Sequence, residues 1–272
     1  MDRRTTPFSG RIAHISLKGQ IDAQLTEGEA ASVAAPLANL LAKPGGALDR
    51  QVVYGEALTL IDRQDGHAYV MAAKDGYCGW LAEAAVGPSL TATHKVASPA
   101  THLYPTASAK APALIPLYLG ARVEITGVEG KWAQTQQGFI PLNHLAPLNH
   151  HAPDPVAVAE MFLHTPYFWG GNTAAGIDCS GLAQAALLAA GIPCPGDSDL
   201  QQKVGVEIPE DHPLQRGDLI FWKGHVALMT SPDQIIHANG GTMSVAYEGL
   251  QDALTRIEAQ GEGSLVARRR PR

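Results

Sequence analysis

The sequence is poor in cysteine, in excess positive charge and in long apolar runs, and each shortage argues against a class of protein. Three cysteines, Cys78, Cys179 and Cys194, stand without a CxxC pair, which argues against a disulfide framework or a zinc ribbon and favours a reducing compartment. The net charge of −6 offers no footprint for nucleic acid. The one basic cluster, Arg268-Arg269-Arg270, is interpreted as a solvated terminal tail.

No apolar run reaches the length of a signal peptide or a membrane span. The N-terminus, MDRRTTPFSGRIAHISLKGQ, carries charged residues throughout. A transmembrane helix needs about 20 consecutive apolar residues. We therefore expect a cytoplasmic protein with no membrane span, although a chain trimmed of its leader would look the same. The oligomeric state does not follow from the sequence.

The chain is rich in glycine (28) and proline (19), which favours short strands and turns over a helical bundle. A weak internal repeat relates Tyr54–Ile61 to Leu119–Thr126, and an acid-glycine turn follows each copy, Asp65-Gly66 and Glu129-Gly130. Alternating runs between glycine turns predict antiparallel strands, here two small barrels at residues 35–90 and 91–148. A generic β-sandwich repeat would show the same pattern. Residues 1–34 receive no assignment.

The composition changes after residue 148, and a third domain is predicted over residues 149–272. Asp154 is expected to cap a helix that has Pro155 at its first position. The apolar stripe predicted for this helix is Val156, Ala159, Met161 and Phe162.

A lone cysteine in the stretch GIDCSG precedes an alanine-rich run, LAQAALLAAG. Apolar residues at helical spacing predict a helix that Asp178 caps and that Gly191 ends. Cys179 then lies in the first turn, where the helix dipole favours a thiolate, the reactive form of a nucleophile. The alternative is that Cys179 fills a position that tolerates a small apolar residue.

Further along, three short strands are predicted at 218–222, 225–230 and 234–238. If Thr230 faces Gln234 across a three-residue loop, Ala227 lies opposite His237, so His225 and His237 share one face of the sheet; an even loop would separate them. A base near a thiol, oriented by a polar group, is the general arrangement of cysteine catalysis. Each histidine alone is equally an ordinary half-buried strand residue. The cysteine and the histidines lack zinc-like spacing, so no metal is expected.

Four segments resemble the NlpC family of papain-like cysteine peptidases, which cleave peptidoglycan stem peptides: TPYFWGGNTAAGIDCSG, CPGDSDLQ, LQRGDLIFWKGHVALMT and IIHANG. The upstream repeats resemble bacterial SH3-like domains. The resemblance implies an α+β fold, in which a helix that bears the cysteine packs on an antiparallel sheet that bears the histidines, preceded by two SH3-like barrels. It also implies a γ-D-glutamyl-L-diamino acid endopeptidase or dipeptidyl-peptidase, without cofactor, that acts on muropeptides with a free N-terminal L-Ala during cell-wall recycling.

The resemblance implies a role for each matching residue. Cys179 is the nucleophile, His225 the general base and His237 the residue that orients it. Tyr167 lies beside the thiol, near the developing oxyanion. The implied substrate contacts are Asp178, Ser180, Ser198 and Trp169, with Glu56 and Tyr77 from the first barrel.

Simpler readings stay open for some of these residues. Asp178 can be no more than a helix cap, Trp169 a core aromatic and Glu56 an exposed strand charge. One departure affects the substrate contacts: many relatives have arginine before the pair that includes Ser198, where this chain has Gly196.

Two other functions compete with a peptidase. An amidase or acyltransferase would use the same Cys-His-His apparatus, because the fold does not choose between them. A protein that only binds cell-wall fragments would use the barrels and leave the third domain inert, but it would have no need of the cysteine together with both histidines.

Overall fold

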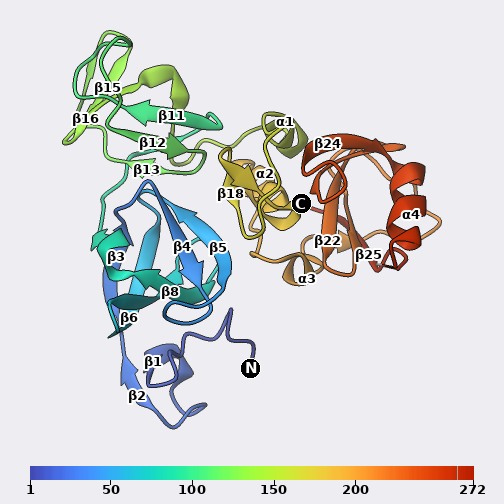
Figure 1. Cartoon of the computed structure of the whole chain (residues 1–272), viewed down its shortest axis with the longest axis horizontal. Coiled ribbons are helices and arrows are strands. Elements are labelled where there is room, and N and C mark those ends of the chain that lie inside the picture. The colour runs from blue at the N-terminus through green and yellow to red at the C-terminus, as the bar shows by residue number, and fades with distance from the viewer. Residues whose placement is uncertain (262) are drawn as a thin grey trace. The chain divides into compact units, whose positions relative to one another are not determined.

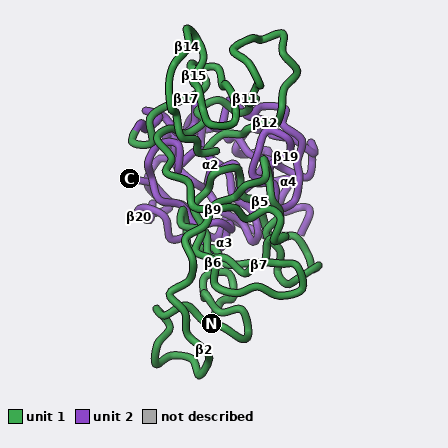
Figure 2. The backbone as a smooth tube through the Cα atoms, turned by 90° about the vertical axis from the view of Figure 1, so that its left-hand side faces the viewer, with its two compact units in different colours: residues 1–149 green, residues 150–272 purple. Residues whose placement is uncertain are grey.

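The computed structural model describes residues 1–261 and 263–272. The chain divides into two compact units, residues 1–149 and 150–272, which are coloured separately in Figure 2. The first unit is built almost entirely of strands, and the second combines helices with a sheet (Figure 1). No helix in the described part of the chain is both long and apolar enough to cross a membrane.

The first half of unit 1 is a seven-stranded antiparallel sheet in the order β5-β4-β8-β7-β6-β3-β9. Its core contains Leu40, Val70 and Leu81, all fully buried. Asp65 and Gly66 form the two-residue turn predicted between β6 and β7, and both have positive φ, as a type I′ hairpin requires. The strands are β3 (Glu29–Val33), β4 (Leu37–Leu41), β5 (Leu48–Val53), β6 (Ala57–Gln64), β7 (His67–Ala72), β8 (Cys78–Ala82) and β9 (Val86–Pro88).

The N-terminal segment folds onto this sheet. A short parallel pair, β1 (Ile12–His14) and β2 (Gln24–Thr26), precedes β3. Arg11 forms an ion pair of 2.6 Å with the buried Asp62 of β6. The N–H of Cys78 donates to the Arg4 carbonyl at 2.7 Å. Residues 1–34, unassigned from sequence, thus supply both β3 and a covering segment.

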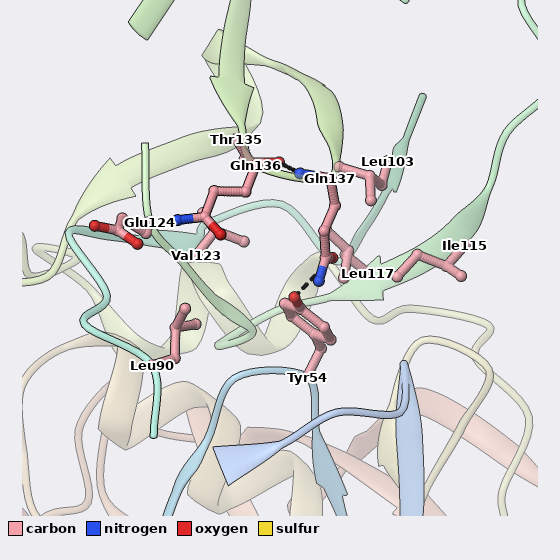
Figure 3. Close-up of a pocket in the computed structure, with 10 residues that line it drawn as sticks. All are labelled: Tyr54, Leu90, Leu103, Ile115, Leu117, Val123, Glu124, Thr135, Gln136 and Gln137. Atoms are coloured by element: carbon pink, nitrogen blue, oxygen red, sulfur yellow. Dashed lines mark hydrogen bonds between the residues drawn. The ribbon is translucent and has the colours of Figure 1, made fainter. Parts of the chain in front are cut away.

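The second half of unit 1 consists of small sheets in the orders β13-β10-β17, β11-β12 and β14-β15-β16 around Leu103, Leu117 and Ile140. A cavity of about 60 Å³ lies beside these residues, and the Tyr54 hydroxyl donates to Gln137 at 2.8 Å at its edge (Figure 3). The strands are β10 (His94–Val96), β11 (Ala100–Leu103), β12 (Ile115–Tyr118), β13 (Arg122–Val123), β14 (Gly127–Glu129), β15 (Trp132–Thr135), β16 (Gly138–Pro141) and β17 (Leu145–Pro147).

Unit 2 is centred on a six-stranded sheet in the order β20-β25-β21-β22-β23-β24. Helix α2 (Cys179–Ala189) lies against β22 and β23, while α4 (Leu250–Ala259) covers the opposite side (Figure 1). The remaining elements are α1 (Pro155–Glu160), α3 (Ser198–Gln201), β18 (Asn172–Thr173), β19 (Gly176–Ile177), β20 (Val206–Glu207), β21 (Leu219–Trp222), β22 (His225–Ser231), β23 (Gln234–Asn239), β24 (Ser244–Gly249) and β25 (Ala267–Arg270).

At the two ends of unit 2, the predicted cap of α1 is confirmed, whereas the predictions for Met161 and for the C-terminal arginines are wrong. Asp154 caps α1 by accepting from the Val156 N–H at 2.9 Å. Met161, however, lies beyond the helix end and is 42% exposed, so it is not part of the apolar stripe. The C-terminal arginines are not a solvated tail: they form β25, and Arg270 pairs with the buried Asp218 at 2.7 Å.

Candidate active site

Helix α2 begins at Cys179, as the capping pattern predicts. The Asp178 carboxylate accepts from the Gly181 N–H at 2.6 Å and from the Ser180 hydroxyl at 2.9 Å through one oxygen. Its other oxygen accepts from the Gly170 N–H at 2.8 Å. Asp178 is therefore a helix cap that also ties the start of α2 to the preceding glycine turn.

Glycines permit this close approach between the turn and the helix. A Cβ on Gly181 would lie 2.4 Å from the Gly171 carbonyl oxygen, and a Cβ on Gly171 would lie 2.5 Å from the Gly176 carbonyl oxygen. Gly170 has φ +73°, which favours glycine over other residues. The pair Gly170-Gly171 thus forms a tight turn that brings the backbone against the first turn of α2.

The Cys179 thiol is buried beside β22, with the residue only 7% exposed. Burial raises the pKa of this thiol to about 12, and the nearby Asp178 charge acts in the same direction. Backbone N–H groups, among them that of Val226, point at the sulfur and lower the pKa, but less strongly. The expectation that the helix start favours a resting thiolate is therefore wrong: desolvation outweighs the helix dipole, and the thiol is protonated at neutral pH.

The two histidines meet on neighbouring strands. His225 Nε2 lies 2.9 Å from His237 Nδ1. The loop between β22 and β23 is shorter than predicted, because Ser231 pairs with Gln234, but an irregularity between Met229 and Ser231 restores the register. Leu228 then pairs with Ile236, which sets Ala227 opposite His237, as predicted.

Both histidines are neutral at pH 7. Burial, together with the neighbouring His237 and Arg256, lowers the pKa of His225 to about 3, while Glu248 opposes them. Burial also lowers the pKa of His237 to about 4. A neutral imidazole can accept a proton, so His225 stands in the protonation state that a general base needs. Its neighbour Val226 is the residue whose N–H points at the Cys179 sulfur.

Sequence reasoning missed Glu248 and Arg256. Glu248 Oε2 lies 3.0 Å from His237 Nε2, and Arg256 binds both Glu248 oxygens at 2.8 Å. In the sequence, Glu248 lies ten residues beyond the last predicted strand and Arg256 lies eight positions further on, so neither stood out. Only the pairing of β23 with β24 could have revealed them.

Tyr167 and Trp169 lie in the segment before the cysteine. The Tyr167 N–H donates to the Met243 carbonyl at 2.8 Å, and Tyr167 bridges to Ile177, two residues before the thiol. Trp169 is 68% exposed, so the reading as a core aromatic is wrong. Trp222, by contrast, is fully buried in the sheet.

Ser198 is buried at the start of α3, and a glutamine of the same helix ties α3 to its neighbours. Gln201 Nε2 donates to the Ser180 carbonyl at 2.9 Å and contacts the Pro195 and Gly196 carbonyls at 3.0 and 3.2 Å. This contact joins α3 and the Gly196 segment to the first turn of α2. Sequence reasoning missed Gln201 as well, although a fully buried glutamine needs such partners.

In unit 1, Glu56 is not the exposed strand charge that the simpler reading supposed. The residue is 7% exposed, and one carboxylate oxygen accepts from Lys74 Nζ at 2.7 Å. The other oxygen is buried without a hydrogen-bond partner in the described part of the chain. Tyr77 is buried beneath the Arg50 guanidinium, which lies 5.2 Å from its ring centroid.

Family models match both units. Residues 164–257 match the NlpC/P60 family, and residues 40–86 match the bacterial dipeptidyl-peptidase Sh3 domain. The chain contains an NlpC/P60 domain, and it is a cysteine peptidase. The NlpC/P60 match includes Cys179, His225 and His237, so it covers every residue of the proposed catalytic set.

Several relatives of this cysteine peptidase are named as dipeptidyl-peptidases. It is 28% identical over 231 residues to a gamma-D-glutamyl-L-lysine dipeptidyl-peptidase of Bacillus cereus, covering 73% of this chain and 69% of the relative. It is 37% identical over 115 residues to dipeptidyl-peptidase 6 of Lysinibacillus sphaericus, a match that spans 39% of this chain and 42% of that protein.

A solved structure shares the fold. The crystal structure of an NlpC/P60 family protein from Bacillus cereus matches with a TM-score of 0.74 at 21% identity, covering 89% of this chain and 99% of the other. At this identity the likeness supports the papain-like fold with its SH3 domain, and it carries no statement on substrate.

Proposed function

We propose that this peptidase hydrolyses the bond between γ-D-glutamate and a diamino acid in peptidoglycan stem peptides, and that it acts in the cytoplasm on muropeptides with a free N-terminal L-Ala. The observation that carries the proposal is the contact between His225 and His237 on neighbouring strands, where the N–H of Val226, the residue after His225, points at the buried Cys179 thiol. The relatives named as gamma-D-glutamyl-L-lysine dipeptidyl-peptidases support the choice of bond.

The first half of the reaction acylates the cysteine. The His225 nitrogen that faces away from His237 is Nδ1, because Nε2 makes the contact with His237. As Cys179 Sγ attacks the γ-carbonyl carbon of the glutamyl residue, Nδ1 takes the thiol proton. The imidazolium then gives that proton to the leaving α-amine of the diamino acid, and a thioester with L-Ala-D-Glu remains on the enzyme.

The second half reverses the roles. Water attacks the thioester carbonyl while His225 takes a proton from it, and the thiol leaves with that proton restored. Both steps pass through an oxyanion, which needs donors aimed at it. The Cys179 N–H at the start of α2 and the Tyr167 hydroxyl are the proposed donors.

Substrate recognition is assigned to carboxylate, hydroxyl and aromatic side chains that can bind the polar groups of a stem peptide. The Asp178 carboxylate and the Ser180 hydroxyl flank the nucleophile, and Ser198 and Trp169 lie on the neighbouring segments. In unit 1, the unpartnered oxygen of Glu56, the residue just before β6, suits an ammonium group, and Tyr77 is the residue just before β8 of the same sheet.

The test uses three matched peptides. The enzyme is incubated with L-Ala-γ-D-Glu-L-Lys, with its N-acetylated form and with the α-linked isomer, and the products are identified by mass. Release of lysine from the first peptide alone supports the proposal. Equal cleavage of the N-acetylated peptide would remove the requirement for free L-Ala, and transfer of the acyl group to an added amine in place of water would favour an acyltransferase.

A further inference from the structure

A continuous chain of polar contacts runs from the catalytic histidine to helix α4. It passes from His225 Nε2 to His237 Nδ1 at 2.9 Å, from His237 Nε2 to Glu248 Oε2 at 3.0 Å, and from both Glu248 oxygens to Arg256 at 2.8 Å. The first three side chains come from the adjacent strands β22, β23 and β24, and the arginine comes from α4.

Strand register explains why these side chains meet. His237 pairs with Ala246 and Ile235 pairs with Glu248, so Glu248 projects from the same face as His237, one pair further along. Such diagonal neighbours are within reach of long side chains. On the same face, α4 packs through Ala253 and Ile257, which places Arg256 of that helix over the strand end.

The contacts leave each ring nitrogen a single role when Glu248 is ionised. Arg256 lowers the pKa of Glu248, so this carboxylate accepts hydrogen bonds and donates none. His237 Nε2 lies 3.0 Å from Glu248 Oε2 without the angle of a regular hydrogen bond, but a lone pair on Nε2 would face the negative carboxylate at that distance. The charge therefore favours a proton on Nε2 of His237, which leaves Nδ1 as an acceptor. His225 Nε2 must then carry the proton that it donates to His237.

The tautomer of His225 decides whether its Nδ1 can accept the proton of the Cys179 thiol. With its proton on Nε2, His225 has a free lone pair on Nδ1, the nitrogen that takes the Cys179 proton. In the reversed arrangement, His237 Nδ1–H would donate to His225 Nε2 and His225 would carry its proton on Nδ1. That arrangement cannot accept a proton from the thiol, and a neutral or absent group at position 248 would permit it.

We propose that Glu248, held by Arg256, is a positioning residue that fixes the tautomers of both histidines and keeps His225 Nδ1 available as the base. The proposal rests on the roles proposed for Cys179 and His225, and it extends them to a group that touches neither substrate nor thiol. A carboxylate that only joined β24 to α4 would have no effect on histidine tautomers.

The direct test is nitrogen NMR of the histidine rings. Protein with ¹⁵N-labelled histidine and Cys179→Ala, which prevents turnover, is compared with the same protein that also carries Glu248→Gln. We expect protons on Nε2 of both rings with Glu248, and a mixed or reversed pattern with Gln, whose amide both donates and accepts. Glu160→Gln is the matched control, because Glu160 makes a similar two-point pair with Arg216 away from the histidines.

Kinetics of the active enzyme supply a second readout. In a serine protease triad, the wrong histidine tautomer lowers kcat by about 10⁴-fold. Because Gln still permits the productive arrangement, we expect Glu248→Gln to lower kcat by about 10-fold or more with KM changed little, and Glu160→Gln to keep the wild-type kcat. Arg256→Gln retains the carboxylate and is expected to lie between wild type and Glu248→Gln.

Unchanged tautomers in Glu248→Gln, or a kcat equal to that of wild type, would overturn the proposal. Failure of the wild-type enzyme to cleave any stem peptide would instead remove the proposed function. The tautomer measurement needs no turnover, so it would still decide the role of Glu248.

Discussion

Removing the Asp178 carboxylate is expected to lower the free energy of unfolding of unit 2. The size of the loss follows from the hydrogen bonds that this carboxylate accepts at the start of α2. Asp178→Ala deletes a helix cap, worth about 1 kcal/mol. It also leaves the buried Gly170 N–H without its charged acceptor at 2.8 Å, and a bond to a charged group contributes about 1.5–3 kcal/mol. The sum is about 2.5–4 kcal/mol, which lowers the Tm of a domain of this size by about 10–16 °C at about 4 °C per kcal/mol.

The assay is thermal unfolding of wild type, Asp178→Ala and Asp178→Asn, with alkylation of Cys179 measured in parallel. Asn retains an oxygen for the Gly181 N–H, but its amide nitrogen faces the Gly170 N–H, so its Tm should lie between the other two. A Tm for Asp178→Ala within about 2 °C of wild type would be a much smaller shift than the lost bonds predict, and it would refute the reasoning. Equal Tm values for the two variants would show that the oxygen retained for the Gly181 N–H contributes nothing.

The remaining predictions concern pH, packing and substrate recognition. Because the pKa of His225 is lowered to about 3, kcat/KM should stay level between pH 7 and about 5 and fall only at lower pH; a decline centred near the ordinary histidine pKa of about 6.5 would contradict this. The folded state disfavours protonation of both buried histidines. Their full contribution to the free energy of unfolding should therefore be present above about pH 6.5, and it should decrease as the pH falls toward the folded-state pKa values. Urea titrations at several pH values measure this contribution. Gly181→Ala should destabilise unit 2 by about 1–3 kcal/mol, because the new Cβ would lie 2.4 Å from the Gly171 oxygen; an unchanged urea midpoint would contradict the packing. Glu56→Gln should raise KM for peptides with free L-Ala while Cys179 keeps its rate of alkylation, whereas unchanged kinetics would exclude Glu56 from recognition.

The helix that carries Cys179 could be predicted from residues close to it in the sequence. The cap, the apolar spacing and the terminal glycine of α2 all lie within fourteen residues of one another, Asp178 to Gly191, and the helix follows from them. The pairing of Ala227 with His237 was predicted correctly, but from a three-residue loop that the hairpin does not have. The actual loop is one residue shorter, and an irregularity near Thr230 compensates for the difference. The faces of the strands were therefore right although the turn was not.

Properties that depend on tertiary burial could not be predicted. The helix dipole at Cys179 is a local effect, whereas the desolvation that outweighs it comes from the packing of α2 against the sheet. Glu248 reaches His237 only through strand pairing and is held by Arg256 from a later helix. The arginines of β25 were predicted to be a solvated tail because the carboxylate that pairs with Arg270, that of Asp218, lies 52 residues away in sequence.

The most direct test of the account compares two cysteine substitutions on L-Ala-γ-D-Glu-L-Lys. Cys179→Ala removes the proposed nucleophile, and Cys78→Ala removes a buried cysteine that packs in unit 1 and has no part in the reaction. We predict that release of lysine is abolished in Cys179→Ala and retained in Cys78→Ala. Lysine release by a folded Cys179→Ala variant at the wild-type rate would contradict the central claim that this thiol is the nucleophile.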